Sequence, residues 1–284
     1  MGWTALLLAG SRPGGDPFAE ANGVRAKALI PVAGEPMIAR PVRALLANDR
    51  IDRVRVLAQE DLLIPLVSSE VETRLAAGKR PSTTLGTNGE IGGTLETSLP
   101  KDERLTIEPS GATIAATLEA IIADPATRYP LLVTTADHAL LDGAMIDDFC
   151  DRASGADVAI GLVERRALMA RLPETKRTWI GFRGGAYSGA NLFALGSPKA
   201  ARAVALWREV EQDRKKGWKL LTALGLPGLL GLARLRTLDQ VLAAMGSKLG
   251  MTIRAIEMTN PLAAVDVDKP VDLELVEALL AGHA

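Results

Sequence analysis

The sequence has little cysteine, little histidine and few aromatic residues, and each shortage excludes a class of protein. A single cysteine, Cys150, rules out an internal disulfide and a metal site made of several cysteines. Two histidines, His138 and His283, are too few to build a histidine-rich zinc centre by themselves. Aromatic residues make up only 4% of the chain, which argues against a platform for stacked bases. We expect Cys150 to be a buried apolar residue on a helix.

The net charge is close to zero, and the sequence also lacks long apolar runs. The formal net charge is -1, so no general basic field attracts nucleic acid. No window reaches the roughly 18 consecutive apolar residues that a membrane-spanning helix needs. The first residues also lack the basic start of a secretory signal. We therefore expect a cytoplasmic protein with no transmembrane segment and no nucleic-acid partner, in which any recognition of phosphate is local.

Short apolar runs alternate with amphipathic stretches along most of the chain. This alternation, clearest over residues 1–150, is typical of an α/β fold with a mostly parallel, doubly wound sheet. The predicted strands are residues 4–9, 54–58, 105–108, 131–135, 158–163, 179–182, 191–195 and 253–257. The predicted helices are residues 36–47, 61–77, 112–123, 144–152, 198–213, 238–249 and 271–281. We expect residues 1–284 to form a single domain, with 198–250 as a helical elaboration.

Two stretches interrupt this alternation. Residues 79–99 are rich in glycine, threonine and proline, and we expect either a binding loop or lid, or an irregular surface segment. Residues 218–233 are rich in leucine and glycine but contain Pro227, so they are too short and too broken to span a bilayer. We expect a pair of short helices packed on the core there, with a patch that faces a membrane or a partner as the alternative.

The N-terminal segment carries the strongest motif. An apolar run over residues 3–9 is stopped by Gly10, which predicts a buried strand followed by a loop. A loop rich in glycine and arginine at this place suits a polyphosphate, because backbone N–H groups can approach it and cations can neutralise its charge. The candidate nucleotide contacts of this loop are Ala9, Gly10, Ser11, Arg12, Gly14 and Gly15.

This segment resembles the signature of the nucleotidyltransferases with a glycosyltransferase-A-type, Rossmann-like fold. That superfamily includes the molybdenum-cofactor guanylyltransferase-like enzymes and the sugar- and polyol-phosphate nucleotidyltransferases. The matching residues are Leu8-Ala9-Gly10-Ser11-Arg12, then Lys27 followed by ALIPVAGEPMI over residues 28–38. The resemblance implies that Arg12 binds phosphates and that Lys27 stabilises charge around the α-phosphorus. Arg25 could take the place of Arg12, because the arginine of the loop lies closer to the strand than is usual in the family.

Ser110 and Gly111 follow the third predicted strand. Ser110 could cap the helix that follows, and Gly111 would let a ligand approach the N-terminus of that helix. In the family that the chain resembles, a Gly/Ser-Ala segment here lies against the nucleobase. The resemblance therefore implies nucleobase contact at Ser110 and Gly111, although capping alone would also explain Ser110.

Asp137 ends the apolar strand predicted at 131–135, which places a carboxylate at the binding edge of the sheet. The resemblance implies that Asp137 binds Mg²⁺, since the family carries a magnesium-binding aspartate at this position. A turn or a helix cap is the alternative for Asp137. His138 is either a turn residue or a contact to the acceptor, because Mg²⁺ favours oxygen ligands.

The segment Asp266-Val267-Asp268-Lys269-Pro270 resembles the C-terminal motif of the same family. Alternation places Asp266 and Asp268 on the same side of a short extended run. The resemblance implies that Asp266 is the second metal carboxylate. For Asp268 we favour the role of helix N-cap, because Lys269 and Pro270 follow it.

Gly189 and Asn191 lie in a segment, residues 188–193, that resembles the part of the family facing the acceptor. Asn191 either donates to a hydroxyl group of a sugar or polyol or satisfies the backbone of a turn.

Together these segments imply a nucleotidyltransferase that transfers NMP from an NTP to a phosphorylated sugar or polyol and releases pyrophosphate. Mg²⁺ is the implied cofactor, and CTP is slightly favoured over the other nucleotides. A phosphate monoester is largely a dianion at neutral pH and needs no general base, which suits a site of carboxylates and cations. Two alternatives remain: a glycosyltransferase that uses a nucleotide sugar, and a nucleotide-binding protein without catalysis.

Overall fold

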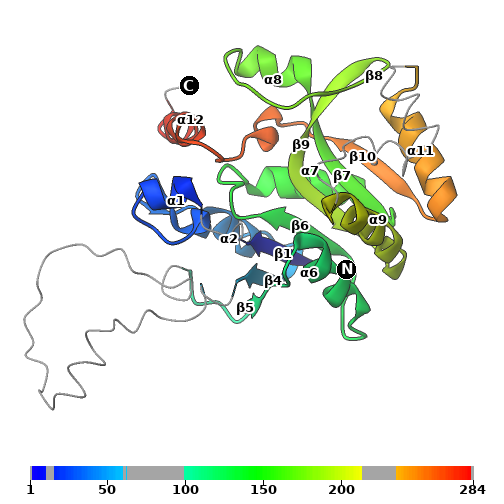
Figure 1. Cartoon of the computed structure of the whole chain (residues 1–284), viewed down its shortest axis with the longest axis horizontal. Helices are drawn as coiled ribbons and strands as arrows, with labels where there is room; N and C mark the ends of the chain where they lie inside the picture. The colour runs from blue at the N-terminus through cyan, green and yellow to red at the C-terminus, as the bar shows by residue number, and fades with distance from the viewer. Residues whose placement is uncertain (1, 11–15, 60–61, 63–98, 213–234, 283–284) are drawn as a thin grey trace, which may run out of the picture.

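The structure is a computed structural model, and it describes residues 2–10, 16–59, 62, 99–212 and 235–282. An eight-stranded sheet forms its centre, with the strand order β10-β7-β9-β6-β1-β4-β5 and with β8 paired to β9 (Figure 1). The strands are β1 Trp3–Ala9, β4 Ile51–Ala58, β5 Leu105–Pro109, β6 Leu131–Thr135, β7 Val158–Glu164, β8 Ile180–Phe182, β9 Gly185–Leu195 and β10 Ile253–Glu257. A two-stranded sheet consists of β2 Pro31–Val32 and β3 Glu35–Pro36.

The sheet is mixed but mostly parallel. The strands β6, β1, β4 and β5 run parallel to one another, as do β7 and β10. The strand β9 lies between β6 and β7 and runs antiparallel to both, and it also pairs antiparallel with β8. The expected doubly wound, mostly parallel α/β fold is confirmed.

The helices cover both faces of the sheet (Figure 1). They are α1 Pro17–Ala21, α2 Ala39–Leu46, α6 Ile114–Ala123, α7 Gly143–Ala153, α8 Arg165–Arg171, α9 Ala201–Gln212, α11 Leu238–Leu249 and α12 Pro270–Leu280. Short 3-10 turns are η1 Lys27–Leu29, η2 Pro198–Ala200 and η3 Pro261–Ala264.

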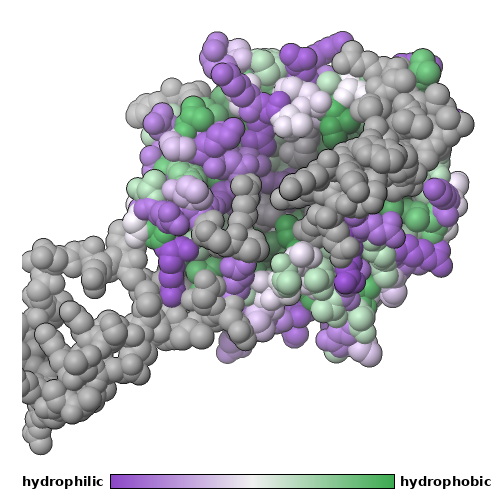
Figure 2. Space-filling view, viewed as in Figure 1, coloured by the Kyte–Doolittle hydropathy of each residue, from purple (hydrophilic) through white to green (hydrophobic). Residues whose placement is uncertain are grey.

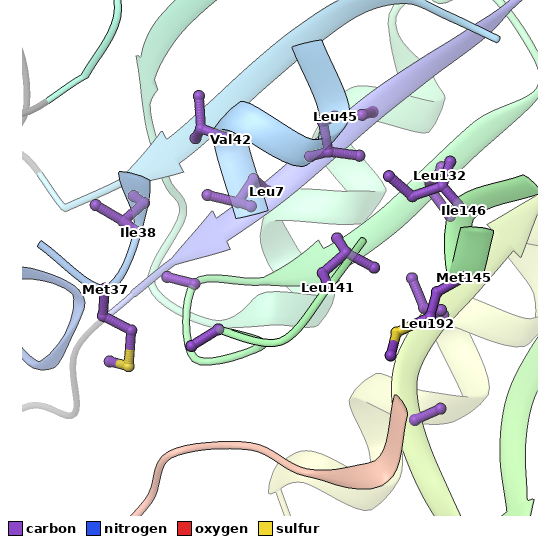
Figure 3. Close-up of a cluster of buried hydrophobic side chains, with 14 of the residues drawn as sticks. Leu7, Met37, Ile38, Val42, Leu45, Leu132, Leu141, Met145, Ile146 and Leu192 are labelled. Carbon is purple, nitrogen blue, oxygen red and sulfur yellow. The ribbon is translucent and has the colours of Figure 1, made fainter. Parts of the chain in front are cut away.

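The first strand shows why the sheet needs both layers. Successive side chains of a strand point to opposite faces, so Leu7 joins one buried cluster and Leu6 the other. The cluster around Leu7 includes residues of α2 and α7, such as Leu45 and Ile146 (Figure 3). The cluster around Leu6 includes Leu118 of α6 together with residues of α9. An apolar run without alternation, as in β1, is the pattern of a strand buried on both faces.

Several local expectations are corrected by the structure. The helices α1 and α8 were not predicted, and β9 begins at Gly185 rather than at Asn191. Thr113, not Ser110, is the N-cap of α6, because the Thr113 hydroxyl accepts a hydrogen bond from Ala116 N at 3.1 Å. The expected helical cap at Asp268 is also wrong: Lys269 holds the N-cap position of α12.

Other expectations lie outside the described residues. They concern the helix at 61–77, except for residue 62, the stretch at 79–99, except for Leu99, and the leucine-rich segment at 218–233. None of the helices in the described ranges combines the length and the hydrophobicity needed to span a membrane. Cys150 lies fully buried on α7 as expected, and burial raises the pKa of its thiol to about 12.

Candidate functional site

A first cavity of about 400 Å³ lies at the carboxyl ends of the parallel strands. Its walls come from the segments that follow β1, β4, β5 and β6, together with the turn at Lys27. Because parallel strands end at the same edge of the sheet, these separate segments meet there. The predicted residues in its lining are Ala9, Gly10, Lys27, Ser110, Gly111 and Asp137.

Lys27 begins η1, and its ammonium group bridges two carboxylates. Its Nζ atom donates to Asp137 Oδ2 at 2.7 Å and also donates to Asp268. Burial of the ammonium acts to lower the pKa of Lys27, but the charges and hydrogen bonds of Asp137 and Asp268 outweigh it, so the pKa is raised. Lys27 is therefore a fully charged group held at the edge of the cavity.

Asp137 follows β6 and is held on both its side chain and its backbone. Thr135 donates from its hydroxyl to Asp137 Oδ1 at 2.5 Å. The backbone N–H of Val267 donates to the carbonyl of Asp137 at 3.1 Å. This backbone contact brings the loop after β6 against the segment that carries Asp266 and Asp268.

Asp266 is a half-buried carboxylate with two side-chain partners. Arg177 donates to it, and Asn191 Nδ2 donates to its Oδ2 atom at 3.1 Å. Burial raises the pKa of Asp266 above its ordinary value, and the hydrogen bond and charge of Arg177 offset this only in part. The charges of Asp137 and Asp268 add to the rise in the pKa of Asp266, so the three carboxylates are close enough to interact.

A second cavity of about 520 Å³ lies on the other side of this cluster. Predicted residues in its lining are Gly189, Asn191 and Asp266. Asp268 lines the second cavity and bonds Lys27, which lines the first, so the two cavities meet at this ion pair. Hydrophilic side chains predominate around α8 and α12 on the face shown in Figure 2.

Asn191 shows how the second cavity is shaped. It has a φ of 49°, in the left-handed region that asparagine tolerates better than most residues. Its side chain bonds the Asp266 carboxylate rather than a turn of its own backbone. Asn191 thus helps to hold Asp266 while it lines the cavity in which an acceptor could lie.

The remaining predicted residues are placed differently. Ser11, Arg12, Gly14 and Gly15 lie outside the described residues. His138 lines neither cavity, and its ring is 1% exposed. Its Nδ1 atom lies 3.5 Å from Thr134 Oγ1, and desolvation lowers its pKa to about 4. The expected contact of His138 with the acceptor is therefore wrong for this structure, because the imidazole points into the protein interior.

Sequence reasoning missed two features of the site. Arg177, which bonds Asp266, comes from the segment between α8 and β8, where no motif marks it. The contact of Lys27 with Asp268 was also missed, because the Asp268-Lys269-Pro270 pattern looked like a helix start. Arg40 gives further support to the loop after β6, since its Nε atom donates to the carbonyl of Ala139 at 3.0 Å.

The donor set at the site suits a hard divalent cation in part. Asp137 and Asp266 supply carboxylate oxygens from two adjoining loops. Among the described residues, no group of three or more His, Cys, Asp or Glu side chains forms a complete metal site. Mg²⁺ commonly takes one or two protein carboxylates and completes its shell with substrate phosphates and water, so the two carboxylates fit such an ion.

No family profile and no curated protein matches this chain. Solved structures do match the chain, and the likeness is first of all one of fold. A 4-diphosphocytidyl-2C-methyl-D-erythritol synthase from Anaerococcus prevotii DSM 20548 is similar over 99% of this chain and 96% of its own, with a TM-score of 0.53. The two sequences are 8% identical, so this likeness concerns the fold alone. The chain therefore shares the fold of this synthase.

A second solved structure is more similar in sequence. It is a hypothetical transferase from Thermus thermophilus, with 27% identity and a TM-score of 0.71. The match covers 96% of this chain and 100% of the Thermus chain. The likeness therefore extends over most of the chain rather than over one segment.

Proposed function

We propose that this protein is a Mg²⁺-dependent nucleotidyltransferase that joins NMP from an NTP to a phosphorylated sugar or polyol and releases pyrophosphate. The observation that carries the proposal is the position of Lys27, which reaches Asp137 in the first cavity and Asp268 in the second. A cation at the boundary of the two cavities can stabilise the charge around a phosphorus atom. That atom would transfer from the nucleotide in the first cavity to the acceptor in the second.

The first cavity suits the nucleotide. Residues 110–113 form one of its walls, and Gly111 N donates to Thr117 Oγ1 at 2.9 Å. A Cβ atom at Gly111 would lie 3.2 Å from Thr117 N, so glycine allows this wall to stay close to α6. We place the nucleobase against Ser110 and Gly111. We favour CTP slightly, because the Anaerococcus neighbour is named for a diphosphocytidyl product.

The reaction requires charge stabilisation rather than a base. An oxygen of the acceptor phosphate attacks the α-phosphorus, the bond from that phosphorus to the bridging oxygen breaks, and pyrophosphate leaves. The acceptor phosphate is already a dianion near neutral pH. Lys27 is charged and positioned, so it can stabilise the charge that develops around the α-phosphorus. Arg12 and the glycine loop would hold the β- and γ-phosphates.

Asp137 and Asp266 are the residues that would hold Mg²⁺. The ion would supply positive charge at the α-phosphate and orient the phosphate oxygens. Lys27 and Arg177 form ion pairs with these two carboxylates. Both cations are on long flexible side chains, which can turn from the carboxylates toward the phosphates of bound substrates.

The second cavity suits the acceptor. Gly189 and Asn191 line it on β9, and Arg177 with Lys176 and Lys269 adds positive charge. Asp266, Asp268 and Asp272 also line this cavity, so its cations offer local contacts for the phosphate of an acceptor rather than a net positive field. An acceptor phosphate at this boundary would face an α-phosphate bound in the first cavity.

Pyrophosphate release tests the proposal. The purified protein would be offered each NTP with Mg²⁺ and a panel of phosphorylated sugars and polyols, and we expect release that depends on both substrates. Release of a nucleoside diphosphate from a nucleotide sugar, without pyrophosphate, would favour a glycosyltransferase instead. Binding of an NTP, detected as a rise in Tm, without turnover of any acceptor would favour a nucleotide-binding protein.

A further inference from the structure

An apolar cavity of about 220 Å³ adjoins the second cavity, and α6, α9 and α11, which are labelled in Figure 1, contribute much of its lining. The two cavities share Ile160 of β7 and Leu242 of α11 in their linings. Every lining residue of the apolar cavity is hydrophobic, whereas the second cavity contains the charged cluster. The pair therefore forms one groove with a charged end and an apolar end, which we call the acceptor groove.

The strands β9 and β7 each line both cavities. Gly189 and Asn191 of β9 line the charged end, and Phe193 and Leu195 line the apolar end. Alternate residues of a strand share a face, so one face of β9 runs along the whole groove. On β7, the residues opposite Gly189, Phe193 and Leu195 are Leu162, Ile160 and Val158, and these also line the groove in order.

The helix α11 follows the same course. Leu238 and Leu242 line the charged end, and Leu242, Met245 and Leu249 line the apolar end. Spacings of three and four residues place these side chains on one face of a helix. One helix face and two strand faces thus run from the ion pairs of the site to the apolar end.

The opposite wall comes from α9 and α6. Trp207 of α9 packs against Phe193 with ring centroids 5.5 Å apart, and Leu118 of α6 lies beside them. Ile160, Phe193, Trp207 and Leu249 are only partly buried. An apolar ligand that covers these large apolar side chains removes their exposed surface from water, and this burial stabilises the complex.

We propose that the acceptor is an amphipathic phosphate ester, with its phosphate at the charged end and an aliphatic chain along the acceptor groove. This proposal rests on the proposed function and names its acceptor class. The paired residues of β7 run four steps from Val158 to Leu162, so the groove extends for about 13 Å along the strands. Arg177, Lys176 and Lys269 line the charged end beside Asp266, Asp268 and Asp272. The three cations suit the phosphate, and the hydrophobic lining suits the chain.

Binding of alkyl phosphates measures the groove without any turnover. Calorimetric titration with butyl, hexyl, octyl and decyl phosphate, each below its micelle concentration, should show roughly threefold to fourfold tighter binding for each added methylene. A terminally brominated decyl phosphate should quench tryptophan fluorescence, and Trp207→Phe should remove most of that quenching. An affinity that does not change with chain length would overturn the proposal.

Variants locate the binding. Met245→Trp should fill the apolar end, so the gain from longer chains should be lost while butyl phosphate binds as before. Ala243→Trp on the exposed face of the same helix is the matched control and should keep the gain. Ala203 lines the apolar end from α9, so Ala203→Phe should fill that end from the opposite wall. It gives a second test if Met245→Trp does not fold. A chain-length dependence that persists in a folded Met245→Trp or Ala203→Phe variant would place the alkyl chain elsewhere and contradict the proposal.

The two proposals fail in different ways. Tail-dependent binding without pyrophosphate release from any NTP would leave the groove intact and contradict the nucleotidyltransferase. Pyrophosphate release that is equally fast with glycerol phosphate and with long alkyl phosphates, together with flat binding affinities, would support the enzyme and contradict the amphipathic acceptor.

Discussion

The two cavities of the site are assembled in different ways. The first lies where the parallel strands β1, β4, β5 and β6 end, and its walls follow directly from these strands except for the segment that begins at Lys27. The second joins distant segments: Arg177 meets Asp266 across 89 residues, and Asn191 meets it across 75. A site at the ends of parallel strands can therefore be predicted largely from local sequence. A site around an antiparallel strand depends on tertiary contacts.

The largest expected effect comes from the residues that join the cavities. Lys27→Ala or Asp137→Ala should reduce nucleotidyl transfer by a hundredfold or more, because each removes charge that the transition state needs. The measurement is the rate of pyrophosphate release at saturating substrates, with circular dichroism to confirm folding. Lys199→Ala is the control, since Lys199 forms an exposed ion pair with Asp157 away from the site. Near-normal release by either site variant would remove Lys27 and Asp137 from the mechanism.

Arg177→Ala tests the second cavity by itself. The side chains of Arg177 and Asp266 are 14% and 15% exposed, so loss of the arginine leaves a largely buried carboxylate without its cation. We expect a loss of about 3 kcal/mol in the free energy of unfolding, measured by urea denaturation. Arg208→Ala breaks the exposed pair with Glu119 and should cost under about 1 kcal/mol. Equal losses in the two variants would show that the second cavity does not depend on this buried pair.

The buried His138 gives a pH-dependent test of the stability of the region that follows β6. Its pKa is lowered from 6.5 to about 4 by burial, so the unfolded chain binds a proton more readily than the folded protein between these values. Stability should therefore fall as the pH decreases through this window, by about 2 kcal/mol between pH 7.5 and pH 5 from this residue. Denaturation curves at the two pH values should show a smaller decrease for His138→Phe. An unchanged decrease would mean that the imidazole titrates normally in the folded protein.

The smallest effect concerns the nucleotide wall of the first cavity. Thr113→Ala removes the N-cap of α6 and should cost about 1 kcal/mol of stability. Asp142→Ala removes the N-cap of α7, away from both cavities, and should cost a similar amount. Because residues 110–113 line the first cavity, only Thr113→Ala should also weaken NTP binding, as measured by calorimetry. Equal NTP affinities in the two variants would separate the helix cap from the nucleotide site.

The sequence predicts much of the frame because its strands are buried and uninterrupted. The strands at Leu131–Thr135 and Ile253–Glu257 and the helix at Leu238–Leu249 have the predicted bounds. Turn chemistry was less reliable. Ser110 and Asp268 are residue types that commonly cap helices, but Thr113 caps α6 and Asp268 instead contacts Lys27. A capping residue and a charged site residue look alike in sequence when a helix follows.

The residues of the site also divide into those that the sequence predicts and those that it does not. Lys27 and Asp137 lie together in the first cavity, where Asp137 follows β6 directly and Lys27 reaches it from η1, beyond α1. Asp266 also lies nearby, although its partner Arg177 comes from a segment with no recognisable pattern. The continuation of the second cavity between β9, α9 and α11 could not be predicted either, since three separate elements must pack before the groove exists.

The central claim is that an NMP unit moves from the first cavity to a phosphate in the second. The most direct measurement follows the α-phosphate itself, with CTP labelled at that position, Mg²⁺ and a mixture of phosphorylated polyols and alkyl phosphates. We predict that the label appears in an acceptor product in equal amount to the pyrophosphate released, and that Lys27→Ala abolishes both. Bound CTP with no transfer of label from any of the four nucleoside triphosphates to any acceptor would contradict the account.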